Sequence, residues 1–219
     1  MTNDSCDTVL FDLGGVLIDW DPRHLYRSLF RGDHAAMERF LSEVCTPAWN
    51  RQQDAGRPWA EAVAMLQKQF PEYDGLIGAY HLRWSEMIAG ETPGTVAILC
   101  ALHAAGTPLY ALTNWSQETF PIAEQRFDFL TLFRCIVVSG SERLVKPDLA
   151  IYRLLVKRYG LDPARCVYVD DNASNAAAAS LLGMRSIHFT LPDTLAGELC
   201  ELGFALGTGG ATSSKTTEQ

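Results

Sequence analysis

Five short apolar runs constrain most strongly what this chain can fold into. Each run has the length of a β-strand, and each is apolar almost throughout rather than at alternate positions. Such runs suit strands that are buried on both faces, as in a parallel sheet covered by helices. The runs are TVLFDL at 8–13, PLYALT at 108–113, CIVVS at 135–139, CVYVD at 166–170 and SIHFT at 186–190.

Amphipathic segments with a helical period separate the runs. The clearest of them span residues 93–105, 150–159 and 174–182. An alternation of strands and helices predicts an α/β fold with a doubly wound parallel sheet. Sheets of this kind bind their ligands beyond the carboxyl ends of the strands. The residues that directly follow each apolar run are therefore candidates for a functional site.

Residues 20–90 interrupt this alternation with helical patterns and no convincing strand. We expect this segment to form a helical cap above the rim of the sheet, and residues 1–19 and 91–206 to form the core. The tail, 207–219, is rich in Gly, Ser and Thr, which predicts disorder. The helical patterns of the cap lie at 22–30, 35–44, 59–70 and 75–87.

Composition and charge exclude several classes of protein. The apolar fraction of 47% and charged fraction of 20% are typical of a soluble globular chain. A net charge of -8 without any cluster of Lys and Arg argues against a nucleic-acid partner. No apolar stretch approaches the ~20 residues of a membrane span, and the start lacks the pattern of a leader peptide. We expect a cytoplasmic protein, a monomer or homodimer, that acts on a small molecule.

The six cysteines fit the same expectation. They are scattered along the chain without a CxxC pair and without a histidine at ligand spacing. This distribution predicts free thiols in a reducing compartment.

Small polar and charged residues lie at the ends of the apolar runs or just after them. Asp12 lies near the end of the first run, and a carboxylate of ordinary pKa, ~3.9, is ionised at neutral pH and can attack phosphorus or carbon without a separate base. Taken alone, Asp12 could equally cap the turn that follows it. The other strand-end residues are Gly14, Thr113, Asn114, Ser139, Lys146, Asp170 and Asp171.

These residues lie in four motifs that occur in a particular order, namely FDLGGVLIDWDP, ALTNWS, KPDLAIY and VYVDDNASN. In this order the sequence resembles the haloacid dehalogenase superfamily, and the helical segment after the first motif resembles members with a helical cap. The resemblance implies a Rossmann-like hydrolase core. Within the superfamily, the FDLG start and the Asp-Asp-Asn run resemble phosphatases of the glucose-1-phosphate type.

The resemblance also implies roles for individual residues. Asp12 would be the nucleophile, Thr113 and Asn114 would donate hydrogen bonds to the transferred group, and Lys146 would hold the nucleophile and the substrate together. Mg²⁺ would be the cofactor. Its protein ligands would be Asp12, the Gly14 carbonyl and Asp171.

Four further residues are candidates for the site, and three of them have two interpretations each. Asp170, Asn172 and Asn175 could surround the metal ligands as a second shell, whereas the two asparagines could instead cap the helix that follows. Trp115 could form a wall of the substrate pocket or pack into the core.

Gly14 departs from the usual phosphatase pattern. Most phosphatases of this superfamily have a second Asp at this position, which protonates the leaving group. Its absence resembles the L-2-haloacid dehalogenases, whose halide leaves without a proton and for which Arg23 and Arg27 could offer a halide cradle. The retained carboxylate at Asp171 favours a phosphatase; an L-2-haloacid dehalogenase or a catalytically silent binding protein stays as the alternative.

A phosphatase without this acid needs another way to release its alcohol. The leaving group could be a good one, such as an anomeric sugar oxygen, or it could be protonated by water or by a cap residue. Asp19 and Asp21 are the nearest spare carboxylates. Both could instead cap a helix that begins at Pro22.

Overall fold

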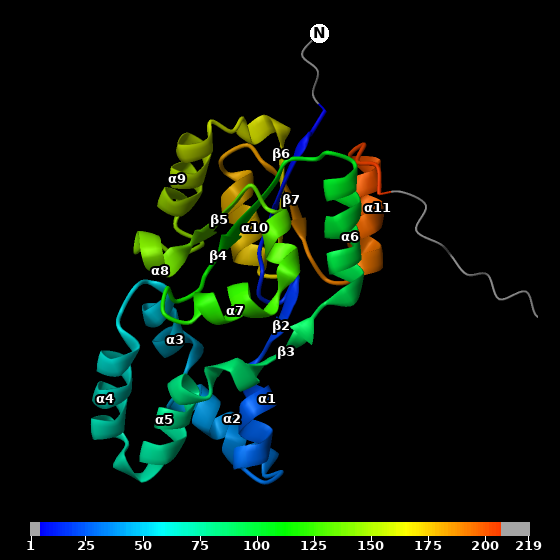
Figure 1. Cartoon of the computed structure of the whole chain (residues 1–219). Helices are drawn as coiled ribbons and strands as arrows, with labels where there is room; N and C mark the ends of the chain where they lie inside the picture. Colours follow the sequence, from blue (N-terminus) through cyan, green and yellow to red (C-terminus); the bar gives the residue numbers. More distant parts are fainter. Residues whose placement is uncertain (1–4, 207–219) are drawn as a thin grey trace, which may run out of the picture.

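The structure, a computed structural model, describes residues 5–206 and is built around a five-stranded parallel sheet (Figure 1). The strand order is β5-β4-β1-β6-β7, so β1 lies at the centre. The register pairs Val9 with Leu109 on one side of β1 and with Val167 on the other. The strands are β1 (Thr8–Phe11), β4 (Leu109–Thr113), β5 (Cys135–Val138), β6 (Cys166–Asp170) and β7 (Arg185–His188).

Helices cover both faces of this sheet, which explains why its strands are apolar throughout (Figure 1). Alternate side chains of β1 point to opposite faces. Val9 and Phe11 belong to the hydrophobic cluster that includes α6 (Pro93–Ala104) and α11 (Pro192–Glu201). Leu10 belongs to a second cluster with α9 (Leu149–Tyr159) and α10 (Ala173–Ser180).

Shorter elements complete the core around the sheet. They are α7 (Phe120–Arg126), η3 (Asp128–Leu132), α8 (Ser139–Glu142) and η4 (Pro163–Arg165).

A group of helices follows β1 and lies beyond one end of the sheet (Figure 1). Two short antiparallel strands, β2 (Ile18–Trp20) and β3 (Ile88–Glu91), lead out to it and back. We call this group the cap. Its helices are α1 (Pro22–Leu29), α2 (His34–Glu43), α3 (Pro47–Asp54), α4 (Trp59–Gln69), η1 (Pro71–Tyr73), α5 (Asp74–Leu82) and η2 (Trp84–Met87).

The cap is attached to the core by packing as well as by the two strands. The hydrophobic cluster on the α6 and α11 face of the sheet continues without interruption to Trp59, Tyr80 and Trp84 of the cap. Hydrogen bonds between the core and the segment that returns from the cap add to this packing. The guanidinium group of Arg126 in α7 donates to the carbonyl oxygen of Ile88 at 3.0 Å.

The predicted doubly wound parallel sheet is confirmed, and the observed strands fall within one or two residues of the five apolar runs. Two features were missed. Helix α3 is largely polar and has no clear apolar period, and β2 and β3 are too short to form a recognisable pattern. The division into core and cap at residues 20 and 90 stays a prediction, and the predicted disorder of 207–219 lies outside the described residues.

Two further expectations concern cysteines and membranes. Cys45, Cys100, Cys135, Cys166 and Cys200 are free thiols, as the sequence predicts. Within residues 5–206, no helix combines the length and apolar character needed to cross a bilayer.

We expect the layer between the sheet and α6 to contribute strongly to stability. Leu99 of α6 is fully buried, so Leu99→Ala should lower the free energy of unfolding by about 2–5 kcal/mol through lost burial and a cavity. Leu181, which is 76% exposed, is the matched control, and Leu181→Ala should change the free energy of unfolding by less than about 0.5 kcal/mol. Urea unfolding followed by circular dichroism measures both values. Equal losses in the two variants would contradict this account of the core.

Candidate active site

Asp12 lies one residue beyond β1, at the carboxyl edge of the sheet. Its main-chain N–H donates to the Val169 carbonyl at 2.8 Å, which continues the pairing of β1 with β6. Its Oδ1 accepts the Leu13 N–H at 2.7 Å, and its Oδ2 lies 2.9 Å from the Lys146 ammonium. One oxygen of the Asp12 carboxylate is thus held by a hydrogen bond from the main chain, and the other is held by the ion pair with Lys146.

Lys146 reaches this point from the loop before α9, and its side chain is fully buried. The ammonium group also lies 2.7 Å from Asp170 Oδ2. The side chain of Asn114 holds the main chain of Lys146 on both sides. Its Oδ1 accepts the Lys146 N–H at 2.8 Å, and its Nδ2 donates to the Lys146 carbonyl at 3.1 Å.

Asp170 is fully buried and has several hydrogen-bond donors besides Lys146. Its carboxylate accepts the Tyr168 hydroxyl at 2.6 Å, the Asn175 amide at 3.0 Å and the Asn172 N–H at 2.9 Å. The two asparagines therefore differ. Asn175 bonds the carboxylate directly, whereas the Asn172 side chain caps α10 by accepting the Ser174 N–H.

Asp171 is adjacent to Asp170 in the chain but, unlike it, is exposed to solvent. Its carboxylate lies directly over Gly15, where an added Cβ would come within 2.2 Å of Asp171 Oδ2. Gly15 also has a positive φ of 76°. Only glycine fits both constraints, which explains the second glycine of the first motif. Gly14, in contrast, has open space at its Cβ position.

The carboxylates of Asp12, Asp170 and Asp171 converge. Each offers one oxygen that lies within 4.8 Å of those of the others. When all three are ionised, they carry three negative charges against the one positive charge of Lys146, so two negative charges are in excess. Burial, and secondarily the neighbouring carboxylate of Asp170, raises the pKa of Asp12 against the opposing effect of Lys146. A divalent cation would balance this excess, and oxygen ligands are those that Mg²⁺ prefers.

Thr113 and Trp115 lie on the neighbouring strand end. Thr113 is buried and ends β4, two residues past the Ala111 that pairs with Phe11. The ring of Trp115 packs against Trp84 at 5.2 Å in a buried aromatic group. This environment favours the packing interpretation for Trp115, and its role as a pocket wall stays a prediction.

Asp19 and Asp21, the carboxylates near the cap that the sequence suggested as proton donors, both accept hydrogen bonds from other residues. Asp21 accepts the Arg23 N–H at 2.8 Å and caps α1 before Pro22, as the capping interpretation predicts. For Asp19 that interpretation is wrong, because this residue belongs to β2 and bonds the His24 ring at 2.9 Å.

Two arginines that could have formed a halide cradle lie on α1. The guanidinium group of Arg23 pairs with Glu38 at 2.6 Å and with Asp21 at 3.3 Å, so its charge is balanced within the cap. Arg27 is an exposed residue of the last helical turn.

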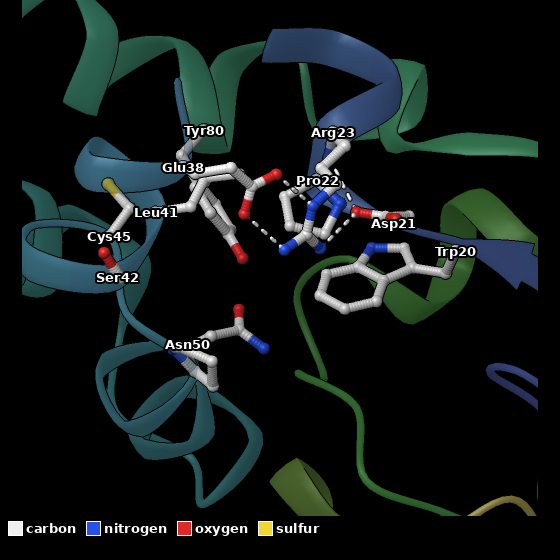
Figure 2. Close-up of a pocket in the computed structure, with 11 residues that line it drawn as sticks. Trp20, Asp21, Pro22, Arg23, Glu38, Leu41, Ser42, Cys45, Asn50 and Tyr80 are labelled. Carbon is white, nitrogen blue, oxygen red and sulfur yellow. Dashed lines mark hydrogen bonds and ion pairs between the residues drawn. The ribbon is translucent and has the colours of Figure 1, made fainter. Parts of the chain in front are cut away.

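A pocket of about 440 Å³ opens inside the cap beside Arg23 (Figure 2). Most of its walls are apolar, although Asn50, Ser42 and the Arg23–Glu38 pair add polar groups. The indole N–H of Trp20 and the side-chain oxygen of Asn50 are buried without a hydrogen-bond partner. A ligand in this pocket could satisfy either group. Its lining includes Trp20, Pro22, Leu41, Cys45, Pro47 and Tyr80.

A second cavity, of about 470 Å³, lies between the cap helix α3 and the edge of the sheet. Lys146 and Asn114 line it from the core, and Arg51 and Asp54 line it from α3. The Arg51 guanidinium donates to the Lys146 carbonyl at 3.0 Å. Neither Arg51 nor Asp54 stands out in the sequence as a site residue. The one available signal was the Thr46-Pro47 pair, typical of a helix start, and the Thr46 side chain does cap α3 by accepting the Trp49 N–H at 3.1 Å.

Comparison with known proteins places this geometry in a family. The model of the haloacid dehalogenase-like hydrolases matches residues 6–183. Mouse acyl-CoA dehydrogenase family member 10 is 28% identical over 92% of this chain, which spans only 20% of that longer protein. The phosphoglycolate phosphatase of Xylella fastidiosa strain 9a5c is 30% identical, with 82% of this chain and 78% of that protein covered.

Solved structures share the fold with lower identity. A HAD family enzyme of Bacteroides thetaiotaomicron, in complex with magnesium and inorganic phosphate, superposes with a TM-score of 0.64 at 21% identity, covering 84% of this chain and 94% of that one. The L-2-haloacid dehalogenase of Xanthobacter autotrophicus, with chloropropionic acid covalently bound, has a TM-score of 0.58 at 17% identity, covering 91% and 84%. The fold alone therefore does not separate the two activities.

The family match over most of the chain, together with phosphatases among its relatives, favours an enzyme over a silent binding protein. This chain belongs to the haloacid dehalogenase-like hydrolase family and is an enzyme of that family.

Proposed function

We propose that this hydrolase is a Mg²⁺-dependent phosphatase that hydrolyses a small phosphomonoester, such as a sugar phosphate, through an aspartyl-phosphate on Asp12. The observation that carries this proposal is the excess of negative charge where Asp12, Asp170 and Asp171 converge. Two unit charges 4 Å apart repel by about 4 kcal/mol at an effective dielectric of 20. An anionic substrate therefore needs a cation beyond Lys146 at this site.

The same observation argues against a metal-free dehalogenase. A 2-haloacid is itself an anion, and Arg23, one of the two candidate halide-binding cations, is balanced by Glu38. The alternative activity would thus have to bind a carboxylate beside uncompensated carboxylates. We therefore favour the phosphatase.

Asp12, Asp171 and the Gly14 carbonyl would hold the magnesium ion, which would supply positive charge to the phosphate oxygens. The free carboxylate of Asp171 fits this role better than Asp170, whose oxygens already accept bonds from Lys146, Tyr168 and Asn175. We assign Asp170 and Asn175 to the positioning of Lys146. Asn172, as the cap of α10, would set the start of the helix after the acidic pair.

In the first step, an Asp12 oxygen would attack phosphorus and the bond to the leaving alcohol would break. Lys146 would steady the nucleophile and offset the charge of the transferred group. Thr113, at the end of β4, would donate its hydroxyl to a phosphate oxygen. Asn114 would hold the loop of Lys146, and the second N–H of the same amide could donate to the phosphate.

Water would then attack phosphorus and release Asp12 and inorganic phosphate. The leaving group would extend toward the cap pocket of Figure 2, because Asn50 of that pocket contacts Asp54 of the neighbouring cavity. Specificity would therefore depend on the cap.

The nucleophile can be tested by replacing one atom. Asp12→Asn should lower kcat for p-nitrophenyl phosphate by at least about a thousandfold, because an amide is a poor nucleophile. Asp193→Asn, an exposed site on α11, is the matched control and should leave the rate unchanged. Phosphate release measures both. Full activity of Asp12→Asn with an intact circular dichroism spectrum would rule out Asp12 as nucleophile.

The metal can be tested by removal and by its ligand. EDTA should abolish phosphate release, and excess Mg²⁺ should restore it. Asp171→Asn should raise the Mg²⁺ concentration for half-maximal activity by at least about tenfold, because it removes a charged oxygen ligand. Calorimetric titration with Mg²⁺ gives the same comparison without turnover. Halide release from L-2-chloropropionate that resists EDTA would support the dehalogenase instead.

The cap pocket can be tested by filling it. Ser42 is an exposed residue at its wall, and Ser42→Trp should lower kcat/KM for a hexose phosphate by about tenfold while changing that for acetyl phosphate less than twofold. Glu43→Trp introduces the same ring at the next position of α2 and is the control. Equal effects on both substrates would show that the leaving group does not enter this pocket.

A further inference from the structure

Asp54 ends helix α3 and lies close enough to the proposed nucleophile, Asp12, for the charge of Asp12 to act on its carboxyl group. Among the described residues that line the cavity between α3 and the sheet edge, it is the one acidic side chain. Lys146 lines the same cavity, and its ammonium group lies 2.9 Å from Asp12. A cap residue thus brings a carboxyl group to the space next to the core site.

Hydrogen bonds from both cap and core fix Asp54 there. Asn50, one turn earlier in α3, donates its amide to Asp54 Oδ2 at 3.1 Å, and the Ser116 N–H bonds the carboxylate from the core. The Ser139 hydroxyl donates to the Asp54 carbonyl at 2.6 Å, while the same hydroxyl oxygen accepts the Trp115 N–H at 2.9 Å. The end of α3 is therefore tied to the ends of β4 and β5.

Close packing after Asp54 maintains this position. Gly56 has a φ of 95°, and a Cβ there would come within 2.9 Å of the Gly140 carbonyl. At Gly140 itself a Cβ would come within 2.6 Å of the Gln117 N. Both glycines allow the turn after α3 to pack against the start of α8.

The surroundings of Asp54 also favour its protonated form. Burial, and then the negative charge of Asp12, raises the pKa of Asp54 to about 7. The Ser116 hydrogen bond and the positive charges of Arg51 and Lys146 oppose this rise. A carboxyl group with a pKa near the working pH can both give and take a proton, as a general acid and base must.

The proposed reaction needs a proton donor for the leaving oxygen. Gly14, two residues after the nucleophile, has no side chain to protonate the leaving oxygen. Asp19 and Asp21 bond His24 and the start of α1, so neither is free for this task.

We propose that Asp54 is the general acid and base of this enzyme, supplied by the cap in place of a side chain at position 14. This inference rests on the proposed phosphatase activity. As Asp12 bonds to phosphorus and the ester P–O bond breaks, the leaving oxygen takes the Asp54 proton and departs as an alcohol. Asp54 then takes a proton from the water that attacks phosphorus; the Asp12–phosphorus bond breaks, and Asp54 is protonated again.

This role widens the substrate class. With a proton donor in place, the leaving group need not be a good one such as an anomeric oxygen or a phenolate. Phosphate monoesters of ordinary alcohols become substrates. Their alcohol would occupy the cap pocket next to Asn50.

The dependence on leaving group separates an acid from a structural residue. Asp54→Asn should lower kcat/KM for an alkyl phosphate, such as glycerol 1-phosphate, by at least about a hundredfold. For p-nitrophenyl phosphate, whose leaving group needs no proton, the loss should stay below about threefold. Glu43→Gln, an exposed carboxylate of α2, is the control for charge on the cap and should change neither. Equal losses for both esters, or no loss, would overturn the role of Asp54.

A second variant tests the same point independently of folding. A Cβ at position 14 would have no atom within 4 Å, so Gly14→Asp can be combined with Asp54→Asn. The double variant should recover at least about tenfold of the lost alkyl phosphate turnover, which a repaired fold would not explain.

Failure of the proposed function has a different signature. If no phosphate ester were hydrolysed in a manner that depends on Asp12, the phosphatase itself would be overturned, and the role of Asp54 with it. Hydrolysis that depends on Asp12 but is lowered equally by Asp54→Asn for both esters would overturn the role of Asp54 alone.

Discussion

The buried ammonium group of Lys146 is the interaction on which the rest of the site depends. It lies between Asp12 at 2.9 Å and Asp170 at 2.7 Å, and burying such charges costs several kcal/mol each unless they are paired and hydrogen-bonded. Tyr168 and Asn175 complete the bonding of Asp170. The ends of β1 and β6 and the loop before α9 must therefore come together in one arrangement, because any other would leave a buried charge without its partner.

The main chain of Lys146 extends this constraint to the cap. Asn114 bonds both its N–H and its carbonyl, and Arg51 of α3 donates to the same carbonyl. The helix that carries Arg51 also carries Asp54, which Ser139 ties to the core. The cap helix and the proposed catalytic lysine are thus held by one set of hydrogen bonds. A carboxyl group from the cap can therefore be positioned as firmly as one from the core.

The sheet and much of the site could be predicted because both depend on local patterns. A continuously apolar run of four to six residues specifies a doubly covered strand, and parallel strands bring the residues that follow them to one edge. Asp12, Thr113 and Asp171 lie at this edge for this reason, and Lys146 reaches Asp12 from the loop before α9. The surroundings of Asp170 and Asp171 differ because Asp170 is the last residue of the buried strand β6, whereas Asp171 follows the strand and is exposed over Gly15.

The sequence by itself determined the parallel sheet, the order of its polar strand ends and the absence of a side chain at Gly14. Only the tertiary structure decided what compensates for that absence. Helix α3 is polar, and its buried residues, Trp49 and Gln53, are too few to produce a clear period. The environment of Asp54 depends on groups far from it in the chain, including Asp12, Ser116 and Lys146. Burial and electrostatic interactions act through space, so the packing of the cap on the core had to be known before this carboxyl group could be identified.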